Sequence, residues 1–107
     1  MRHFHHIGIP TTISRAGERH LPELKCYVQG FESSPFGIEW MRFEPDCPLP
    51  ELVKQVAHVA FQVDELEAEL EGKEILIPAT SPSTGTRVAF IVDNGAPVEF
   101  LQILPQP

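Results

Sequence analysis

The sequence predicts an α+β protein built from two βαβββ modules, whose eight strands form an open, barrel-like cleft and whose first module has a missing or rudimentary helix. Similar segments open the two halves of the chain, His6-Ile7-Gly8-Ile9 and His58-Val59-Ala60-Phe61. Similar segments also close them, Ile38-Glu39-Trp40 and Val98-Glu99-Phe100. Such a repeat indicates two copies of one supersecondary unit. We expect module one at about residues 1–46 and module two at about 54–107, within a single domain spanning 1–107.

The two copies differ in length. Glu39 follows His6 by 33 positions and Glu99 follows His58 by 41, so the first copy is shorter by eight residues. Eight residues make about two helical turns. Gly17 and Pro22 interrupt any helix between residues 11 and 23. We therefore place the deficit at the helix of the first module.

The first half is rich in strand signals. Residues 3–9 end at Pro10 and indicate a strand of mixed polarity. Two β-rich runs, 25–31 and 36–43, have hairpin spacing around a turn at 32–35. Residues 44–50 contain three prolines, which is typical of a connector.

The second half is more regular. A strand at 55–63 leads into a helix for which Asp64 is the expected N-cap, Glu67 completes a capping box and Gly72 is the C′ residue. Leu66 and Leu70 lie one turn apart on this helix. Strands follow at 74–80, 86–93 and 97–104, and Asn94-Gly95 before the last one is the strongest hairpin signal in the chain.

Composition excludes several classes of protein. The formal net charge is −7 with no cluster of lysine and arginine, so a phosphate backbone or an anionic membrane surface would be repelled. No apolar run approaches the roughly 18 residues of a membrane span, and no signal peptide is recognisable, so we expect a cytoplasmic protein. Cys26 and Cys47 have neither disulfide-framework nor zinc-site spacing, and free thiols are expected. A small-molecule or a protein partner remains compatible with this composition.

Four repeated residues are the candidate site: His6, Glu39, His58 and Glu99. Alternate residues of a strand share one face, and the residues two positions from these are mostly apolar or small. The four polar groups therefore belong to a face that is otherwise built to be buried. A buried carboxylate needs a cation or a metal. Two imidazoles and two carboxylates suit one divalent ion such as Zn, Ni, Co, Mn or Fe, and leave two positions of a six-coordinate ion for a substrate.

Taken singly, none of these residues would be assigned as a ligand. An isolated strand histidine is more often packed or solvated, and an isolated glutamate usually lies on a solvent face. The recurrence of His at each module start and Glu at each module end carries the metal hypothesis. By the same criterion His3, His5 and His20, which have no counterpart in the other half, receive no role. Arg42 and Arg87 are ordinary strand residues, although either could meet an anionic substrate.

The pattern resembles the glyoxalase/bleomycin resistance/dioxygenase (vicinal oxygen chelate) superfamily and is closest in motif to lactoylglutathione lyase-like proteins. The matching positions are His6 in FHHIGI, Glu39 in GIEWM, His58 in VAHVAF and Glu99 in PVEFL. The resemblance implies an isomerase, lyase or epimerase that moves a proton next to a carbonyl through a metal-bound enediolate. Glu39 or Glu99 would be the base, with a slight preference for Glu99 because its module is intact. It also implies a homodimer, and Phe31, Phe36 and Trp40 are candidates for covered apolar surface.

Two alternatives stay open. A metal-dependent dioxygenase characteristically uses two histidines and one carboxylate, which the fourth ligand here disfavours. A non-catalytic binding protein of the bleomycin-resistance type would sequester a small molecule, but those relatives lack the four ligands. The chain also has no obvious basic set for glutathione or coenzyme A, so the resemblance does not extend to a substrate.

Overall fold

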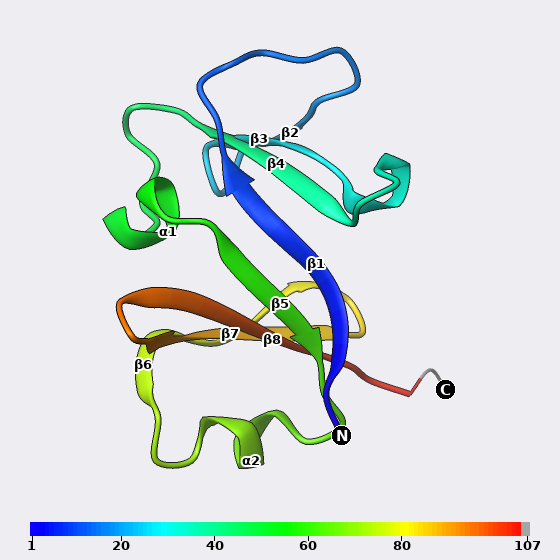
Figure 1. The fold of residues 1–107 in the computed structure, drawn as a ribbon, viewed down its shortest axis with the longest axis vertical. Helices are drawn as coiled ribbons and strands as arrows, with labels where there is room; N and C mark the ends of the chain where they lie inside the picture. The colour runs from blue at the N-terminus through cyan, green and yellow to red at the C-terminus, as the bar shows by residue number, and fades with distance from the viewer. Residues whose placement is uncertain (106–107) are drawn as a thin grey trace.

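Residues 1–105, which the computed structural model describes, form one mixed sheet of eight strands that curls into a half-barrel (Figure 1). The order across the sheet is β2-β3-β4-β1-β5-β8-β7-β6. In chain order the strands are β1 (His3–Pro10), β2 (Arg19–Leu21), β3 (Cys26–Gln29), β4 (Ile38–Phe43), β5 (His58–Gln62), β6 (Glu74–Ser83), β7 (Thr86–Asp93) and β8 (Ala96–Ile103). The predicted α+β class and eight-stranded open cleft are confirmed. The predicted second module, 54–107, ends two residues outside the described range.

The middle of the sheet carries the repeat. β1 runs parallel to β4, β5 runs parallel to β8, and β1 and β5 pair antiparallel between them. In each half, the residue opposite the glutamate is the one two positions after the histidine: Gly8 opposite Glu39, and Ala60 opposite Glu99. Between the halves, where β1 pairs with β5, each histidine lies opposite the residue two positions after the other histidine: His6 opposite Ala60, and His58 opposite Gly8. The two modules are therefore related by an approximate two-fold axis between β1 and β5.

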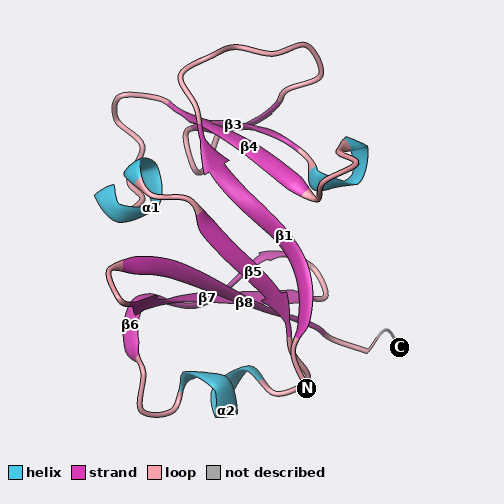
Figure 2. Cartoon of the chain, viewed as in Figure 1, coloured by secondary structure: helices cyan, strands magenta, loops and turns pink. Residues whose placement is uncertain are grey.

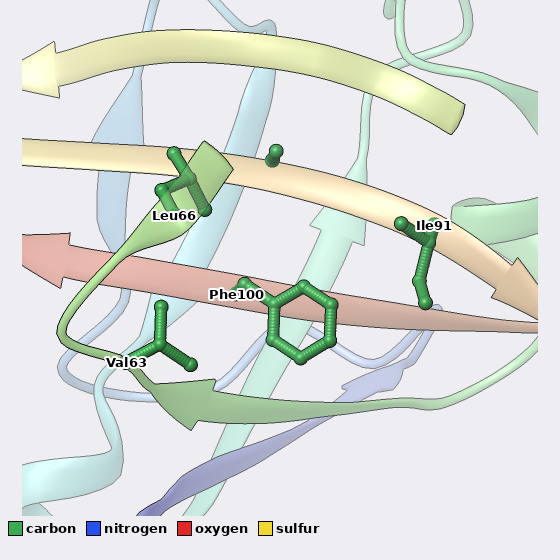
Figure 3. Packing of buried hydrophobic residues seen from close by; sticks show 5 residues of the cluster. Val63, Leu66, Ile91 and Phe100 are labelled. Atoms are coloured by element: carbon green, nitrogen blue, oxygen red, sulfur yellow. The ribbon is translucent and has the colours of Figure 1, made fainter. Parts of the chain in front are cut away.

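Module two has an apolar core on the outer face of its half of the sheet. The helix α2 (Leu66–Leu70) lies over this face, and Leu66 is fully buried (Figures 1 and 3). It belongs to a cluster that β7 and β8 complete, formed by Val63, Leu66, Ala89, Ile91 and Phe100. The leucine spacing noted in the sequence thus reflects burial, because Leu70 also packs against this cluster.

The N-terminal end of α2 differs from the prediction, and the C-terminal end agrees with it. Asp64 is not the N-cap: the helix begins at Leu66, whose backbone N–H donates to Gln102 Oε1 on β8 at 3.0 Å. Glu67 does not close a capping box but binds the Arg87 guanidinium. A tertiary contact has replaced the local one, which sequence spacing cannot reveal. The predicted C′ position is right, since Gly72 follows the C-cap with a φ of +72°.

Module one has no helix between its first two strands in the described chain, as predicted. Only part of the eight-residue deficit lies there, however. The connection between β1 and β2 (residues 11–18) is three residues shorter than that between β5 and β6 (residues 63–73). The strands β2 and β3 are also shorter than β6 and β7, and the longer connections at residues 22–25 and 30–37 offset part of this difference. Placing the whole deficit at the helix was therefore wrong. The strand β2 was missed because it has three residues, two of them exposed and polar.

The connection between the modules contains a second feature missed in the sequence. The helix α1 (Glu51–Gln55) starts directly after Pro50 and buries Val53 against the rest of the chain (Figure 2). The helix packs against β1 and β8. It ends at Gln55, the first residue of the predicted 55–63 strand, and β5 starts three residues later, at His58. Neither α1 nor α2, nor any other helix within residues 1–105, is long and apolar enough to cross a membrane.

Candidate metal centre

The four predicted ligands come from the four adjacent central strands. Glu39 lies on β4, His6 on β1, His58 on β5 and Glu99 on β8, which are neighbours in that order across the sheet. The register described above brings them onto one face, because paired residues of adjacent strands share a side. Residues far apart in sequence thus become neighbours through backbone pairing alone.

The side chains converge. His58 Nε2 lies 3.0 Å from Glu99 Oε1, and His6 Nε2 lies 3.4 Å from the same oxygen. His6 Nε2 also lies 3.6 Å from Glu39 Oε1. The two imidazole rings are 5.6 Å apart between centroids. His6, His58 and Glu99 each offer a ligand atom within 4.8 Å of the others, and Glu39 adjoins this group through His6.

Burial and the missing hydrogen bonds support a ligand here. His6 and His58 are 4% and 2% exposed. His6 Nε2 and His58 Nδ1 are buried without a hydrogen-bond partner among the described residues. A buried polar atom without a partner costs free energy, so native proteins rarely keep one without a reason. A divalent ion held by His6 Nε2, His58 Nε2 and the carboxylates would remove the cost at His6, and the nitrogen and oxygen donors fit such an ion.

The pKa values of Glu99 and Glu39 are shifted in opposite directions. Burial alone would raise the pKa of Glu99, but the adjacent His58 and His6 imidazoles lower it to about 2. Burial raises the pKa of Glu39, and the attraction of His6 does not cancel this effect. Burial alone would lower the pKa of His6, but its carboxylate neighbours, Glu99 first, outweigh burial and raise it. Glu99 is thus held as an anion, whereas Glu39 is a carboxylate with weaker stabilisation.

Aromatic rings and a glycine fix the two imidazoles. Phe31 stacks on His6 with 5.3 Å between ring centroids, and Phe90 meets His58 edge-on at 5.0 Å. The His58 ring lies over Gly8, where an added Cβ would come within 2.1 Å of its Cε1 atom. Gly8 is therefore required by the ring and was missed in the sequence. Its position two residues after His6, opposite a ligand on the neighbouring strand, is the signal that could have revealed it.

The remaining histidines and arginines divide clearly. His5 contacts the site, with its Nδ1 2.7 Å from His6 Nδ1, although sequence reasoning gave it no role. His20 instead stacks on Tyr27 and pairs with Glu44. Arg42 and Arg87 bind glutamates, Glu18 and Glu67 respectively, on the face of the sheet opposite the candidate ligands. They are therefore not positioned to meet a substrate at the candidate centre.

Comparison with solved structures gives the fold independently. A hypothetical protein from Bacillus halodurans C-125 superposes with a TM-score of 0.71 and 19% sequence identity, covering 99% of this chain and 97% of that one. Methylmalonyl-CoA epimerase from Mycobacterium tuberculosis superposes with a TM-score of 0.61 and 17% identity, covering 95% and 88%. The chain shares the fold of these two structures. No family model matches the sequence, and no curated protein matches it.

Proposed function

We propose that this protein binds one divalent transition-metal ion through His6, Glu39, His58 and Glu99 and catalyses proton transfer at a carbon next to a carbonyl. The observation that supports it best is the convergence of three buried ligand atoms within 4.8 Å, together with a buried His6 Nε2 that has no hydrogen-bond partner within residues 1–105. A bound ion would give this nitrogen the partner that the two carboxylates, at 3.4 and 3.6 Å, do not provide.

The donor set defines what the site offers. A bound ion would act as a Lewis acid that polarises the substrate carbonyl oxygen. His6 and His58 supply neutral nitrogen donors whose orientation is fixed by Phe31, Phe90 and the space above Gly8. The His6 and His58 side chains are 5% and 1% exposed and the Glu39 side chain is 20% exposed, so we expect a substrate to approach from the side of Glu39.

We assign the base to Glu39 rather than Glu99. The Glu99 side chain is 12% exposed, and its Oε1 contacts both imidazoles. The Glu39 side chain is 20% exposed, and within residues 1–105 its one ion pair is with His6, at 3.6 Å. Glu39 therefore has fewer contacts to lose when it turns to a substrate proton. Burial raises its pKa, which brings its basicity closer to that of an effective general base near neutral pH. Glu99 would remain with the two histidines as the anchoring ligand.

The fold and the donor set together support this reaction class. An epimerase, or an isomerase or lyase of the glyoxalase type, needs one carboxylate to remove a proton and a site that stabilises the resulting oxyanion. The structural similarity to methylmalonyl-CoA epimerase supports the epimerase branch, and methylmalonyl-CoA is therefore the first substrate to test. The substrate is expected to be a small molecule.

The test has two stages. Protein purified without chelator should contain close to one equivalent of a transition metal by elemental analysis, and His58→Ala should contain little. In D₂O, the metal-loaded protein should exchange the α-proton of a substrate, followed by proton NMR. Glu39→Gln should retain metal and lose exchange by about 10²- to 10⁴-fold, the usual contribution of a general base. Loss of exchange in Glu99→Gln alone would reassign the base, and absence of metal from the wild type would refute the proposal.

A binding protein is the second candidate function. The rings of Phe31 and Phe90 adjoin the candidate ligands, and a metal-chelating small molecule could be held there without reaction. Calorimetry with a planar hydroxamate tests whether a ligand binds to the metal or to the protein alone. Binding to the metal-loaded protein and not to the metal-free protein supports a metal-centred site. Bound hydroxamate without exchange of any α-proton substrate would favour the binding protein.

Homodimer formation stays a prediction. Phe31 and Trp40 do not form free apolar surface, because Phe31 packs on the His5 and His6 rings and Trp40 lies beneath Arg15. Phe36 is 76% exposed and Phe4 54% exposed, and these two are the better candidates for a covered surface. Light scattering should give twice the 12.0 kDa chain mass at tens of micromolar protein. A mass near that of one chain would contradict a dimer.

A further inference from the structure

We propose that His5 is a positioning residue that orients His6 for metal binding, by accepting a hydrogen bond from His6 Nδ1. The inference rests on the proposed function, because it concerns the same metal ligand. The two Nδ1 atoms are 2.7 Å apart, a hydrogen-bonding distance. The far nitrogen of His6, Nε2, faces Glu99 and Glu39. His6 thus has one ring nitrogen against His5 and the other in the candidate centre.

The chemistry of imidazole fixes the direction of this hydrogen bond in the metal-bound protein. A ligand nitrogen must present a lone pair, so His6 Nε2 carries no proton when it binds an ion. The proton of a neutral His6 must then lie on Nδ1 and be donated to His5 Nδ1. His5 in turn must be neutral with its own proton on Nε2. Outer partners of this kind fix the tautomer and ring angle of a ligand histidine, and they are usually carboxylates, carbonyls or waters.

A β-bulge explains how two consecutive strand residues reach each other. Successive residues normally point to opposite faces of a sheet. In the β1–β5 ladder Phe4 pairs with Phe61 and His6 pairs with Ala60, so β1 has one more residue than β5 at this point. The additional residue is His5. Bulges redirect side chains beside functional sites, and here the bulge turns His5 toward the ring of its neighbour.

Phe31 holds the pair together. Its ring centroid lies 4.4 Å from that of His5 and 5.3 Å from that of His6, so the three rings form one cluster. His5 is therefore restrained by packing as well as by the hydrogen bond. A restrained acceptor orients the ligand, whereas a mobile one would not.

The second module has no histidine at the equivalent position. Ala57 precedes His58 in the position that His5 holds before His6. His58 Nδ1 is buried and without a hydrogen-bond partner in the described chain, and the ring is instead held by its Nε2 contact with Glu99 and by packing on Gly8 and Phe90. A histidine before the ligand is thus not a requirement of the strand itself. It is specific to the bulged strand β1.

The first experiment compares metal affinities. Co²⁺ is titrated into metal-free protein, with the absorption spectrum of the bound ion as the readout. His5→Leu keeps an apolar contact with Phe31 but removes the acceptor, and should weaken Co²⁺ binding by about 10- to 100-fold. His5→Asn can place its amide oxygen near the original Nδ1 position and should bind within a few-fold of wild type. His20→Asn, a histidine substitution away from the centre, should leave affinity unchanged.

The second experiment observes the hydrogen bond. In Zn²⁺-loaded protein with ¹⁵N-labelled histidine, NMR should show the His6 proton on Nδ1 and a scalar coupling from that nitrogen to His5 Nδ1. No coupling, or a proton on another atom of His6, would overturn the proposal. So would equal Co²⁺ affinity in His5→Leu and wild type, or equal weakening in His5→Leu and His5→Asn. If the wild type binds neither ion, the proposed function itself fails, and this inference fails with it.

Discussion

The two modules build their halves of the candidate site in the same way and cover their outer faces in different ways. In both, a parallel strand pair places a glutamate opposite the residue two positions after a histidine. Behind this pair, module two has a helix with a buried leucine. Module one has the loop 11–18, held by polar contacts: Gln29 donates to the Ala16 carbonyl, Glu18 binds Arg42, and Arg15 lies 4.4 Å above the Trp40 ring.

This difference shows which part of the unit the site needs. The central strands β4, β1, β5 and β8 keep equivalent registers in both halves, while the outer strands and the covering segment have changed in length and character. The inner face is therefore constrained by side-chain geometry, and the outer face only by the need to cover the sheet. Substitutions should then act by different mechanisms in the two regions.

The largest effect should come from the core of module two. Leu66→Ala removes a fully buried side chain from the cluster under α2 and leaves a cavity. We expect the free energy of unfolding to fall by about 2–5 kcal/mol. Urea denaturation followed by far-UV circular dichroism measures it. A loss below about 1 kcal/mol would mean that α2 is as dispensable as the loop of module one.

Gly8→Ala should be next, because it tests the inner face. The new methyl group would collide with the His58 ring, which must move away from the centre. Overpacking of this kind costs about 1–3 kcal/mol, and metal affinity should fall as well. The matched change in module two is Ala60→Gly, at the position opposite His6, which relieves no clash and should retain metal. Equal metal affinity in the wild type and Gly8→Ala would show that the His58 ring does not depend on this space.

The two glutamates should respond to pH with opposite signs in the metal-free protein. The pKa of Glu99 is lowered to about 2, so its carboxylate stabilises the fold above about pH 4.5, and this contribution is lost as the pH falls toward 2. The pKa of Glu39 is raised, so its ionisation disfavours the fold once the pH rises through its folded-state pKa. Glu99→Gln should therefore cost about 1–2 kcal/mol at pH 7, and Glu39→Gln should stabilise.

Urea midpoints at several pH values between 3 and 7, with chelator present, test this contrast. The gap between wild type and Glu99→Gln should close as the pH falls, because the protonated carboxyl and the amide become equivalent. The advantage of Glu39→Gln should disappear over the same range. Parallel pH profiles for the two variants would contradict the asymmetry.

The smallest effect should come from the loop of module one. Arg15→Ala removes the cation–π contact with Trp40. Such a contact contributes about 0.5–1 kcal/mol at an exposed site. Thermal unfolding should show a shift of a few degrees at most. A loss comparable to that of Leu66→Ala would show that the loop is as important to its module as the helix is to the other.

The sequence predicted the features that depend on short-range pattern or on the repeat. The Asn94-Gly95 turn is a local signal, and both residues have positive φ values, 51° and 78°. The strand positions of the four candidate ligands follow from the repeat, because equivalent segments of a duplicated unit occupy equivalent places. The reaction, the metal and the roles of the ligands remain predictions.

What the sequence missed depends on contacts between distant segments. Gln102 caps α2 from another strand, and no spacing near Asp64 indicates that. The role of Gly8 depends on a ring from β5. His5 was set aside because the repeat offers no partner for it, yet its place arises from a bulge that only the β1–β5 register reveals. A search for residues repeated in both halves finds the features that the halves share, and it misses a feature that only one half has.

Because β1 and β5 pair antiparallel, the two modules are arranged like the two subunits of a symmetric dimer, joined here in one polypeptide. A single βαβββ unit carries one imidazole and one carboxylate, which is half of a coordination set. Two identical units joined through their first strands in the present register would complete the set without a covalent link. Such an assembly would be symmetric, and any change in one half would appear in the other. Fusion removes this restriction, so one half of this chain can keep its helix while the other acquires a bulge with a second histidine.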